Sequence, residues 1–285
     1  MKYYLSAILG MLMWSSSFIA TKIAYRAVSP ILLCVIRFAI ASVIMMIMRL
    51  MQKKRTRIPL RDQRNIILSA AAGISVYYVL ENIALQYTTA SAASFIEAAY
   101  PIITVLIGVW IYHEKTSKRM LAGIFISIIG VLILSGFSAS EGSGLKGDIL
   151  LLIDGALWGF YNFLVQRIPK EYDNFSVSYY QMLWGTVMFL PMLFLEKPVF
   201  TNITSETIIA ILYLSTGCSV AAFLLYNYGL SGISASSASA IMNLMPLFGV
   251  LLSFLILHET ISLSQIAGGI LIMLGVYIST NRHAV

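Results

Sequence analysis

The sequence predicts an all-α membrane protein with ten transmembrane helices, arranged as two inverted five-helix repeats. Three observations lead to this prediction: the composition, the length of the apolar stretches and an internal repeat. Of the 285 residues, 59% are hydrophobic and 11% are charged, whereas a soluble domain has about 25% charged residues. The mean hydropathy is +0.85. This composition excludes a secreted disulfide module, a disordered tail and an ordinary cytosolic enzyme.

The apolar stretches are long enough to cross a membrane as helices, which requires about 20 mostly apolar residues each. Short polar connections separate them, and together they use up nearly the whole chain. No room remains for a soluble catalytic domain. The predicted spans are 4–25, 29–50, 65–86, 91–112, 119–137, 147–167, 175–196, 206–229, 234–257 and 262–280.

Basic residues are distributed unequally between the connections. With the N-terminus in the cytoplasm, 14 of the 19 Lys and Arg residues fall on the cytoplasmic side, four on the other side, and Arg37 within a span. The positive-inside rule therefore predicts a multi-pass membrane protein with both termini cytoplasmic. The basic run from Lys53 to Arg64 is expected to lie against anionic headgroups rather than nucleic acid.

A shift of 145 residues aligns the second half of the chain with the first. Over positions 90–135 the shift gives 17 identities, among them Pro101 with Pro246. Chance similarity among apolar residues would not also match prolines and two His-Glu pairs in register. The repeat predicts two domains of five spans each, residues 1–140 and 141–285. Because five is odd, the second repeat enters the membrane inverted, as in many secondary transporters, which bind substrate between their repeats.

Three motifs accompany this architecture: a Trp14-Ser-Ser-Ser-Phe start, an Ala-Ser-x-Ala-Ser…Pro…Glu pattern that ends the fourth and ninth spans, and Ala-Gly…Gly-Val helices after them. Together they resemble the EamA family of the drug/metabolite transporter superfamily, over nearly the full chain. The resemblance implies an inner-membrane carrier, often an exporter, of amino acids, nucleobases, aromatic cations or other small metabolites. The sequence has no P-loop motif, so a gradient must drive uphill transport, and no cofactor is expected.

Four ionisable residues fall inside the predicted spans, where charge is costly and marks functional candidates. They are Arg37, Glu81, Glu97 and Asp154. At about 1.5 Å of rise per residue, all four lie roughly 10–13 Å below the outer surface. Arg37 has a structural alternative, an ion pair with one of the acids, and Glu81 is the third-ranked acid because it is a candidate for that pair. The acids that remain are expected to hold either a proton or a cationic substrate, which predicts proton coupling.

Glu97 is the first candidate for proton coupling. Its predicted helix face carries small residues and Pro101, and this proline frees the carbonyl of Glu97 itself. Its repeat counterpart Pro246 frees the carbonyl of Met242, next to Asn243. The two prolines are predicted hinges, and Asn243 is predicted to line the substrate site. The alternative is that both prolines only kink packing helices.

Asp154 is the second candidate. With Trp158 and Tyr161 it follows the spacing i, i+4, i+7, which places the three on one helix face. Trp14 is the counterpart of Trp158 in the first half. An acid that shares a helix face with two aromatic rings predicts a cation-binding site. The alternative is aromatic packing within the helix bundle.

Small and polar residues are expected to hold the spans together. Asn82 and Asn227 match between the halves and are expected to form interhelical hydrogen bonds. The two cysteines are expected to be small buried hydrophobes. Close packing of helices, or of protomers, is predicted at Gly123, Gly130, Gly268 and Gly275.

The sequence thus predicts a secondary active transporter that exports small metabolites or drug-like compounds by alternating access, coupled to proton antiport. Cationic and amino-acid-like compounds are candidate substrates. A passive channel or facilitator, or a lipid-handling membrane protein, is the alternative. The chain has neither an H-E-x-x-H motif nor a credible Ser–His pair, so neither an enzyme nor a metal site is expected. The expected partners are a small-molecule substrate, protons and membrane lipid, without nucleic acid, and the chain is a monomer or a homodimer.

Overall fold

The fold is that of a computed structural model, which describes residues 1–52, 56–84, 87, 96–134, 145–257 and 262–280. Within these ranges the chain is helical, and extended pairing is limited to an isolated antiparallel bridge between Val28 and Phe200. The predicted all-α class is confirmed for this part of the chain.

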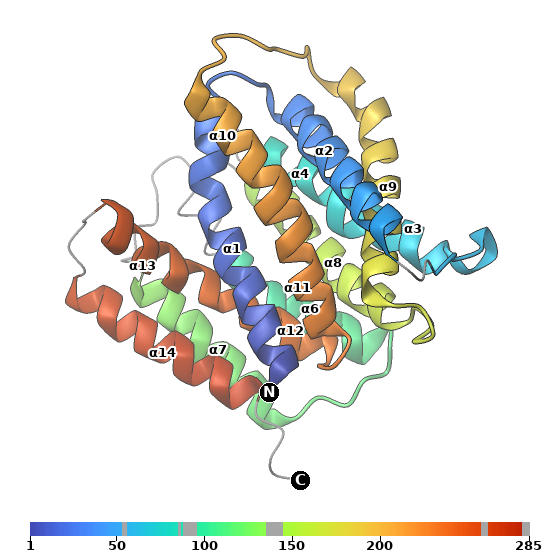
Figure 1. Ribbon diagram of the computed structural model, residues 1–285. Coiled ribbons are helices and arrows are strands. Elements are labelled where there is room, and N and C mark those ends of the chain that lie inside the picture. Colours follow the sequence, from blue (N-terminus) through green and yellow to red (C-terminus); the bar gives the residue numbers. More distant parts are fainter. Residues whose placement is uncertain (53–55, 85–86, 88–95, 135–144, 258–261, 281–285) are drawn as a thin grey trace. The chain divides into compact units, whose positions relative to one another are not determined.

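Most of the described residues lie in helices, which Figure 1 labels. The α-helices are α1 (Lys2–Ala24), α2 (Pro30–Met51), α3 (Arg64–Ala70), α4 (Val76–Ala84), α6 (Tyr100–Trp110), α7 (Lys118–Leu134), α8 (Leu145–Gln166), α9 (Asn174–Met192), α10 (Ser205–Tyr213), α11 (Ala222–Leu230), α12 (Ala235–Ile241), α13 (Met245–Leu257) and α14 (Leu263–Thr280). Short 3-10 turns are η1 (Leu60–Asp62), η3 (Leu193–Leu195) and η5 (Met242–Leu244), and π-helical turns are η2 (Ala71–Ser75) and η4 (Leu214–Ala221).

Seven helical segments in the described ranges are long and apolar enough to cross a membrane. They are Lys2–Thr21, Pro30–Met51, Arg64–Ala84, Leu145–Gln166, Ser205–Leu230, Ala235–Leu252 and Leu263–Thr280. Helices α6, α7 and α9 overlap three further predicted spans without being among these seven. The chain is therefore a multi-pass membrane protein, and the count of ten spans stays a prediction.

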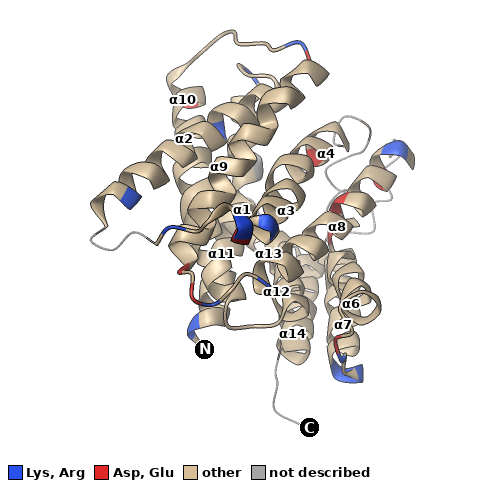
Figure 2. Cartoon of the chain, turned by 90° about the vertical axis from the view of Figure 1, so that its right-hand side faces the viewer, with Lys and Arg blue, Asp and Glu red and all other residues tan. Residues whose placement is uncertain are grey.

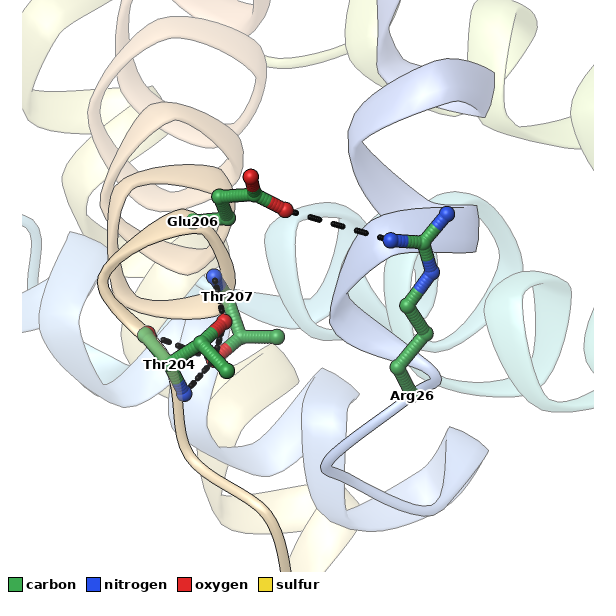
Figure 3. A network of polar contacts seen from close by, with 4 residues as sticks. All are labelled: Arg26, Thr204, Glu206 and Thr207. Atoms are coloured by element: carbon green, nitrogen blue, oxygen red, sulfur yellow. Dashed lines mark hydrogen bonds and ion pairs between the residues drawn. The ribbon is translucent and has the colours of Figure 1, made fainter.

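Side chains cap several helices at their first turn, where backbone N–H groups have no partner within the helix. Asp173 accepts the N–H of Ser176 at 2.9 Å at the start of α9. At the start of α10, Thr204 and Thr207 bond to each other's backbone N–H in a capping box, shown in Figure 3. These local signals fix where α9 and α10 begin.

Two of the spanning segments contain a π turn. The π turn η2 lies between α3 and α4, and the π turn η4 lies between α10 and α11. A shift of 145 residues carries the range of η2 onto residues 216–220, which lie inside η4. A π turn has wider spacing than an α-helix and is frequent at functional sites.

The chain forms two compact units. Unit 1 comprises Met1–Asn82 and Leu164–Gly232, and unit 2 comprises Ile83–Phe163 and Ile233–Val285. Each unit draws on both halves of the sequence. The predicted division at residue 140 concerns the order of the repeats along the chain, and it stays a prediction.

Glycines bring α7 and α14 of unit 2 into backbone contact, side by side in Figure 1. A Cβ atom on Gly130 would lie 2.7 Å from the backbone nitrogen of Ile272 and 2.8 Å from the carbonyl oxygen of Gly268. Gly123 meets Gly275 in the same way, so the two helices are antiparallel. The expected close packing is confirmed, and it joins helices within one chain.

Polar side chains join the helices of unit 1. The Asn227 amide on α11 donates to the hydroxyl of Ser178 at 2.9 Å and to the carbonyl oxygen of Gln181 at 2.8 Å, both on α9. Gln181 in turn donates to the hydroxyl of Ser69 on α3 at 2.8 Å. The expected interhelical role of Asn227 is confirmed.

Candidate functional site

The predicted site residues are distributed over both units. Unit 1 contains Trp14, Arg37 and Glu81, and unit 2 contains Glu97, Pro101, Asp154, Trp158, Tyr161, Asn243 and Pro246. Figure 2 shows that most charged residues lie towards the ends of the helices. Arg37 and Asp154 are exceptions, because they lie inside long helices and are 4% and 0% exposed.

Hydroxyl groups and aromatic rings surround Arg37, which lies in the first half of α2. Its Nε donates to the hydroxyl of Ser219 at 2.5 Å, and its Nη2 donates to the hydroxyl of Tyr78 at 3.3 Å. The guanidinium carbon lies 4.7 Å from the ring centre of Tyr78 and 5.2 Å from that of Phe38. Arg37 thereby links α2 to α4 and to the π turn η4.

Glu81 lies in the same unit and interacts electrostatically with Arg37. Ion pairs in the described part of the chain include Arg26–Glu206 and Arg61–Asp62, which lie near the surface. The structural alternative for Arg37, an ion pair with one of the acids, stays a prediction. Its direct contacts are with hydroxyl groups and aromatic rings.

Asn82 follows Glu81 and connects three helices. The hydroxyl of Tyr25 donates to the Asn82 carbonyl oxygen, and the Asn82 amide donates to the sulfur of Cys34 at 3.3 Å. The expected interhelical role of Asn82 is confirmed. Cys34 is buried, as expected. It also accepts a hydrogen bond, which no sequence pattern predicts.

Trp14 makes its hydrogen bond within unit 1. The indole N–H donates to the carbonyl oxygen of Cys218 at 2.9 Å. The ring centre lies 5.0 Å from that of Phe223 and 5.2 Å from that of Tyr226. Because Cys218 belongs to η4, this hydrogen bond joins α1 to the π turn.

In unit 2, α8 carries the predicted acid and aromatic residues. Asp154, Trp158 and Tyr161 are all buried. The rings of Trp158 and Tyr161 stack with their centres 5.0 Å apart and their planes 20° from parallel. Gly155, next to Asp154, admits the ring of Tyr100 from α6, since a Cβ there would lie 2.5 Å from the ring. The structure thus places a buried carboxylate on the same helix as a stacked aromatic pair.

Glu97 is partly buried and lies just before a break in the helix. The chain turns at Ala98–Ala99, and α6 begins at Tyr100 with Pro101 in its first turn. Pro101 therefore follows a break and does not lie in the middle of a continuous helix. The small residues predicted on the face before Glu97 lie outside the described part of the chain.

A second break precedes Pro246. The 3-10 turn η5 separates α12 from α13, and Pro246 is the second residue of α13. Asn243 in this turn is buried, and its amide donates to the hydroxyl of Ser127 on α7 at 2.7 Å. One turn earlier, the hydroxyls of Thr104 and Ser239 are 2.9 Å apart and join α6 to α12.

Within unit 2, the buried carboxylate of Asp154 and the stacked rings of Trp158 and Tyr161 combine a polar group with aromatic surface, which is the chemistry of non-covalent small-molecule binding. Three or more His, Cys, Asp or Glu residues do not gather into a metal-binding group within the described ranges.

Comparison with known proteins identifies the family of this chain. The model of the EamA-like transporter family matches residues 1–136 and 145–281. The chain belongs to this family. The resemblance noted in its motifs is confirmed, and the chain is a membrane protein of a transporter family.

Relatives of this chain are similar to it over most of their length. A protein of Archaeoglobus fulgidus described as an uncharacterized transporter is 30% identical over 99% of this chain and 98% of its own. The uncharacterized transporter YyaM of Bacillus subtilis is 28% identical over 84% of this chain and 81% of its own. A protein crystal structure superposes with a TM-score of 0.82 over 98% of both chains at 19% identity, which shows the same fold.

Proposed function

We propose that this EamA family member is a secondary active transporter that exports small metabolites or drug-like compounds in exchange for protons. It works by alternating access between two inverted five-helix repeats in the cell membrane, with both termini in the cytoplasm. The 145-residue repeat and the equivalent positions of the two π turns support this architecture. Exchanging the conformations of two such repeats turns an outward opening into an inward one.

The observation that carries the proposal is the burial of Asp154 in the middle of the spanning helix α8. An ionisable group at such a place is expensive and marks a substrate or proton pathway. The stacked rings of Trp158 and Tyr161 on the same helix supply aromatic faces, which attract cations. One carboxylate that holds either a proton or a cationic group, but rarely both, provides the exchange that antiport requires.

Glu97 is the second proposed coupling group, because it lies immediately before the break that leads into α6. Pro101 and Pro246 each follow such a break and are proposed as the hinges of alternating access. Asn243 is proposed to contribute a polar group beside the second hinge.

Arg37, Glu81 and Trp14 receive a different role within this proposal. Because Arg37 and Trp14 make hydrogen bonds inside unit 1, they are proposed to position helices rather than to bind substrate. Glu81 is proposed to balance the charge of Arg37.

Transport by purified protein in proteoliposomes tests the proposal. Under an imposed pH gradient, small amines, aromatic cations and amino acids are screened for accumulation against their own gradients. Asp154→Asn and Glu97→Gln are compared with wild type and with Glu171→Gln, a neutralised acid at an exposed position.

We expect wild type and Glu171→Gln to accumulate a substrate, and Asp154→Asn to retain substrate exchange while losing proton-driven accumulation. Equal accumulation by wild type and both buried-acid variants would show that these acids are structural. Equilibration without accumulation by wild type would favour a passive facilitator.

A further inference from the structure

The connection between α2 and α3 is folded against the beginning of α9, within unit 1. Arg49, in the last turn of α2, donates to the carbonyl oxygen of Thr56 at 2.5 Å and to the hydroxyl of Ser176 at 3.2 Å. Its guanidinium carbon lies 4.8 Å from the ring centre of Tyr179 and 5.3 Å from that of Tyr180. Arg49 is buried, so its charge serves to hold the connection in place.

Further hydrogen bonds fix residues 58–63 of this connection. The Gln63 amide donates to the carbonyl oxygen of Ile58 at 2.7 Å, and the indole N–H of Trp184 donates to Gln63 at 2.7 Å. The hydroxyl of Tyr172 donates to the carboxylate of Asp62 at 2.6 Å. This bond raises the pKa of Tyr172 to about 12, so its hydroxyl remains a donor at neutral pH.

The side chains that are not held inward are exposed, and they are of two kinds. Arg57, Arg61 and Arg64 are cationic. Pro59 and Leu60 lie among them and are apolar, and Leu60 is 68% exposed. Residues 57–64 thus expose three guanidinium groups together with the apolar side chains of Pro59 and Leu60.

Basic residues from the connection between α8 and α9 extend this surface. The Asn65 amide donates to the carbonyl oxygen of Arg167 at 3.2 Å, which places the two connections next to each other. Arg167 and Lys170 are both exposed. The nearby acids are Asp62, which Tyr172 and Arg61 engage, Asp173, which caps α9 and bonds to Thr56, and the exposed Glu171. Positive charge therefore predominates.

We propose that Arg57, Arg61, Arg64, Arg167 and Lys170, here called the basic patch, bind the headgroup of an anionic phospholipid in the cytoplasmic leaflet. Guanidinium groups match phosphate oxygens in geometry as well as in charge. A lipid is the occupant because Leu60 offers apolar surface for the glycerol and upper acyl region, which a free phosphate would leave exposed to water. The site is independent of the transport chemistry proposed above.

Lipid retention by the purified full-length protein tests this site. Protein in a neutral detergent is mixed with phosphatidylglycerol and phosphatidylcholine in equal amounts, and bound lipid is counted by native mass spectrometry. The test variant replaces Arg57, Arg61 and Arg64 by glutamine. The matched control replaces three basic residues assigned to the opposite side, Arg26, Lys146 and Lys197, by glutamine.

Wild type and control are expected to retain phosphatidylglycerol in preference to phosphatidylcholine. Removing each arginine is expected to weaken this retention about fivefold at low salt. Leu60→Ser is expected to weaken it too while leaving all charges in place. Equal retention of both lipids by wild type, unchanged preference in the arginine variant, or competition by inorganic phosphate as strong as by lipid would overturn the proposal.

Discussion

The two units of this EamA family protein join their helices by the same two means in different proportion. In unit 1, long-range hydrogen bonds link many of the helices, as between Arg37 and Ser219 or between Asn227 and Gln181, and Gly229 brings α11 against the backbone of α1. In unit 2, glycines let the backbones of α7 and α14 touch, most closely where Gly275 meets Ser127, and hydrogen bonds at Asn243 and Thr104 join further elements. Both are recognised ways of joining helices where lipid tails remove the hydrophobic driving force between them.

The difference changes what a buried charge means in each unit. Arg37 is part of the hydrogen-bonded network, so its charge contributes to holding unit 1 together. Asp154 lies on a helix whose close approach to α6 is provided by Gly155. Because backbone contact contributes much of the packing in unit 2, we expect Asp154 to contribute less to stability than Arg37 does. Burial alone does not separate the two expectations.

The largest effect is expected when the glycine contact is blocked. Gly130→Leu places a side chain where the backbone of α14 already lies, and backbone yields less readily than side chains. We expect a loss of about 3 kcal/mol or more of stability and little folded protein. Yield of monodisperse protein by size-exclusion chromatography in detergent measures it. Gly249→Leu is the control, because a Cβ there has no neighbour within 4 Å. Equal yields of the two variants would contradict the glycine-contact model of unit 2.

The second-largest effect is expected when the hydrogen-bond network of unit 1 is disrupted. Arg37→Met removes the charged donor from Ser219 and Tyr78 and leaves Glu81 without its nearby cation. We expect a loss of about 3 kcal/mol, measured by thermal unfolding in detergent. Arg26→Met removes an exposed arginine and is expected to change little. Similar unfolding of both variants would mean that Arg37 does not support the network.

A smaller loss of stability is expected when the charge of Asp154 is removed than when that of Arg37 is removed. Asp154→Asn conserves the volume of the side chain, so we expect it to change stability by less than about 1.5 kcal/mol. The same thermal unfolding assay measures it beside Arg37→Met. A loss as large as that of Arg37→Met would assign Asp154 a structural role and remove the difference between the units.

Replacing Trp14 tests the contribution of a single hydrogen bond in unit 1. Trp14→Phe keeps an aromatic ring beside Phe223 but removes the donor to the carbonyl oxygen of Cys218. We expect a loss of about 1 kcal/mol in thermal unfolding. Trp110→Phe, at an exposed tryptophan, is the control. If both variants unfold together, the bond contributes nothing measurable.

The smallest effect is expected at Asp173, which belongs to unit 1 but lies outside the spans. Burial disfavours its charged form, yet the hydrogen bonds from Ser176 and Thr56 together with that of its own backbone outweigh burial and lower the pKa below its ordinary value of 3.8. A lowered folded-state pKa means that the stabilisation is complete above the ordinary pKa and is lost as the pH falls through the folded value. Asp173→Ala is expected to lose about 0.5 kcal/mol at pH 7. Thermal unfolding near pH 3 should show a smaller difference between variant and wild type, and a difference that grows on acidification would contradict the cap.

Much of the fold follows from the sequence because length, hydropathy and small-residue spacing act locally. The roles of Asn82, Asn227 and the four glycines of α7 and α14 were predictable for this reason. The multi-pass character likewise follows from apolar stretches that need only be counted.

The partners of Arg37 were not predictable in the same way. Counting depth along regular helices places Arg37 in one layer with three acids, but only Glu81 shares its unit. Its direct partner Ser219 lies in the π turn η4, where the period of 3.6 residues no longer holds. Tyr78 has no charge to mark it as a partner. The proposed coupling roles of Asp154 and Glu97 rest on position and burial and stay predictions.

The two π turns also bear on how this chain tolerates insertions and deletions. Each turn holds one residue more than an α-helix of the same rise and rotation, so removing one residue there would restore a regular helix and leave the side chains beyond it facing the same way. The same deletion in a regular α-helix would rotate every side chain beyond it by about 100° around the helix axis. After a deletion in η2, Asn82 would therefore still face Cys34, and after one in η4, Asn227 would still face α9. A single-codon deletion is thus expected to be tolerated at either π turn and to disrupt the packing when it falls elsewhere in the same spanning segments.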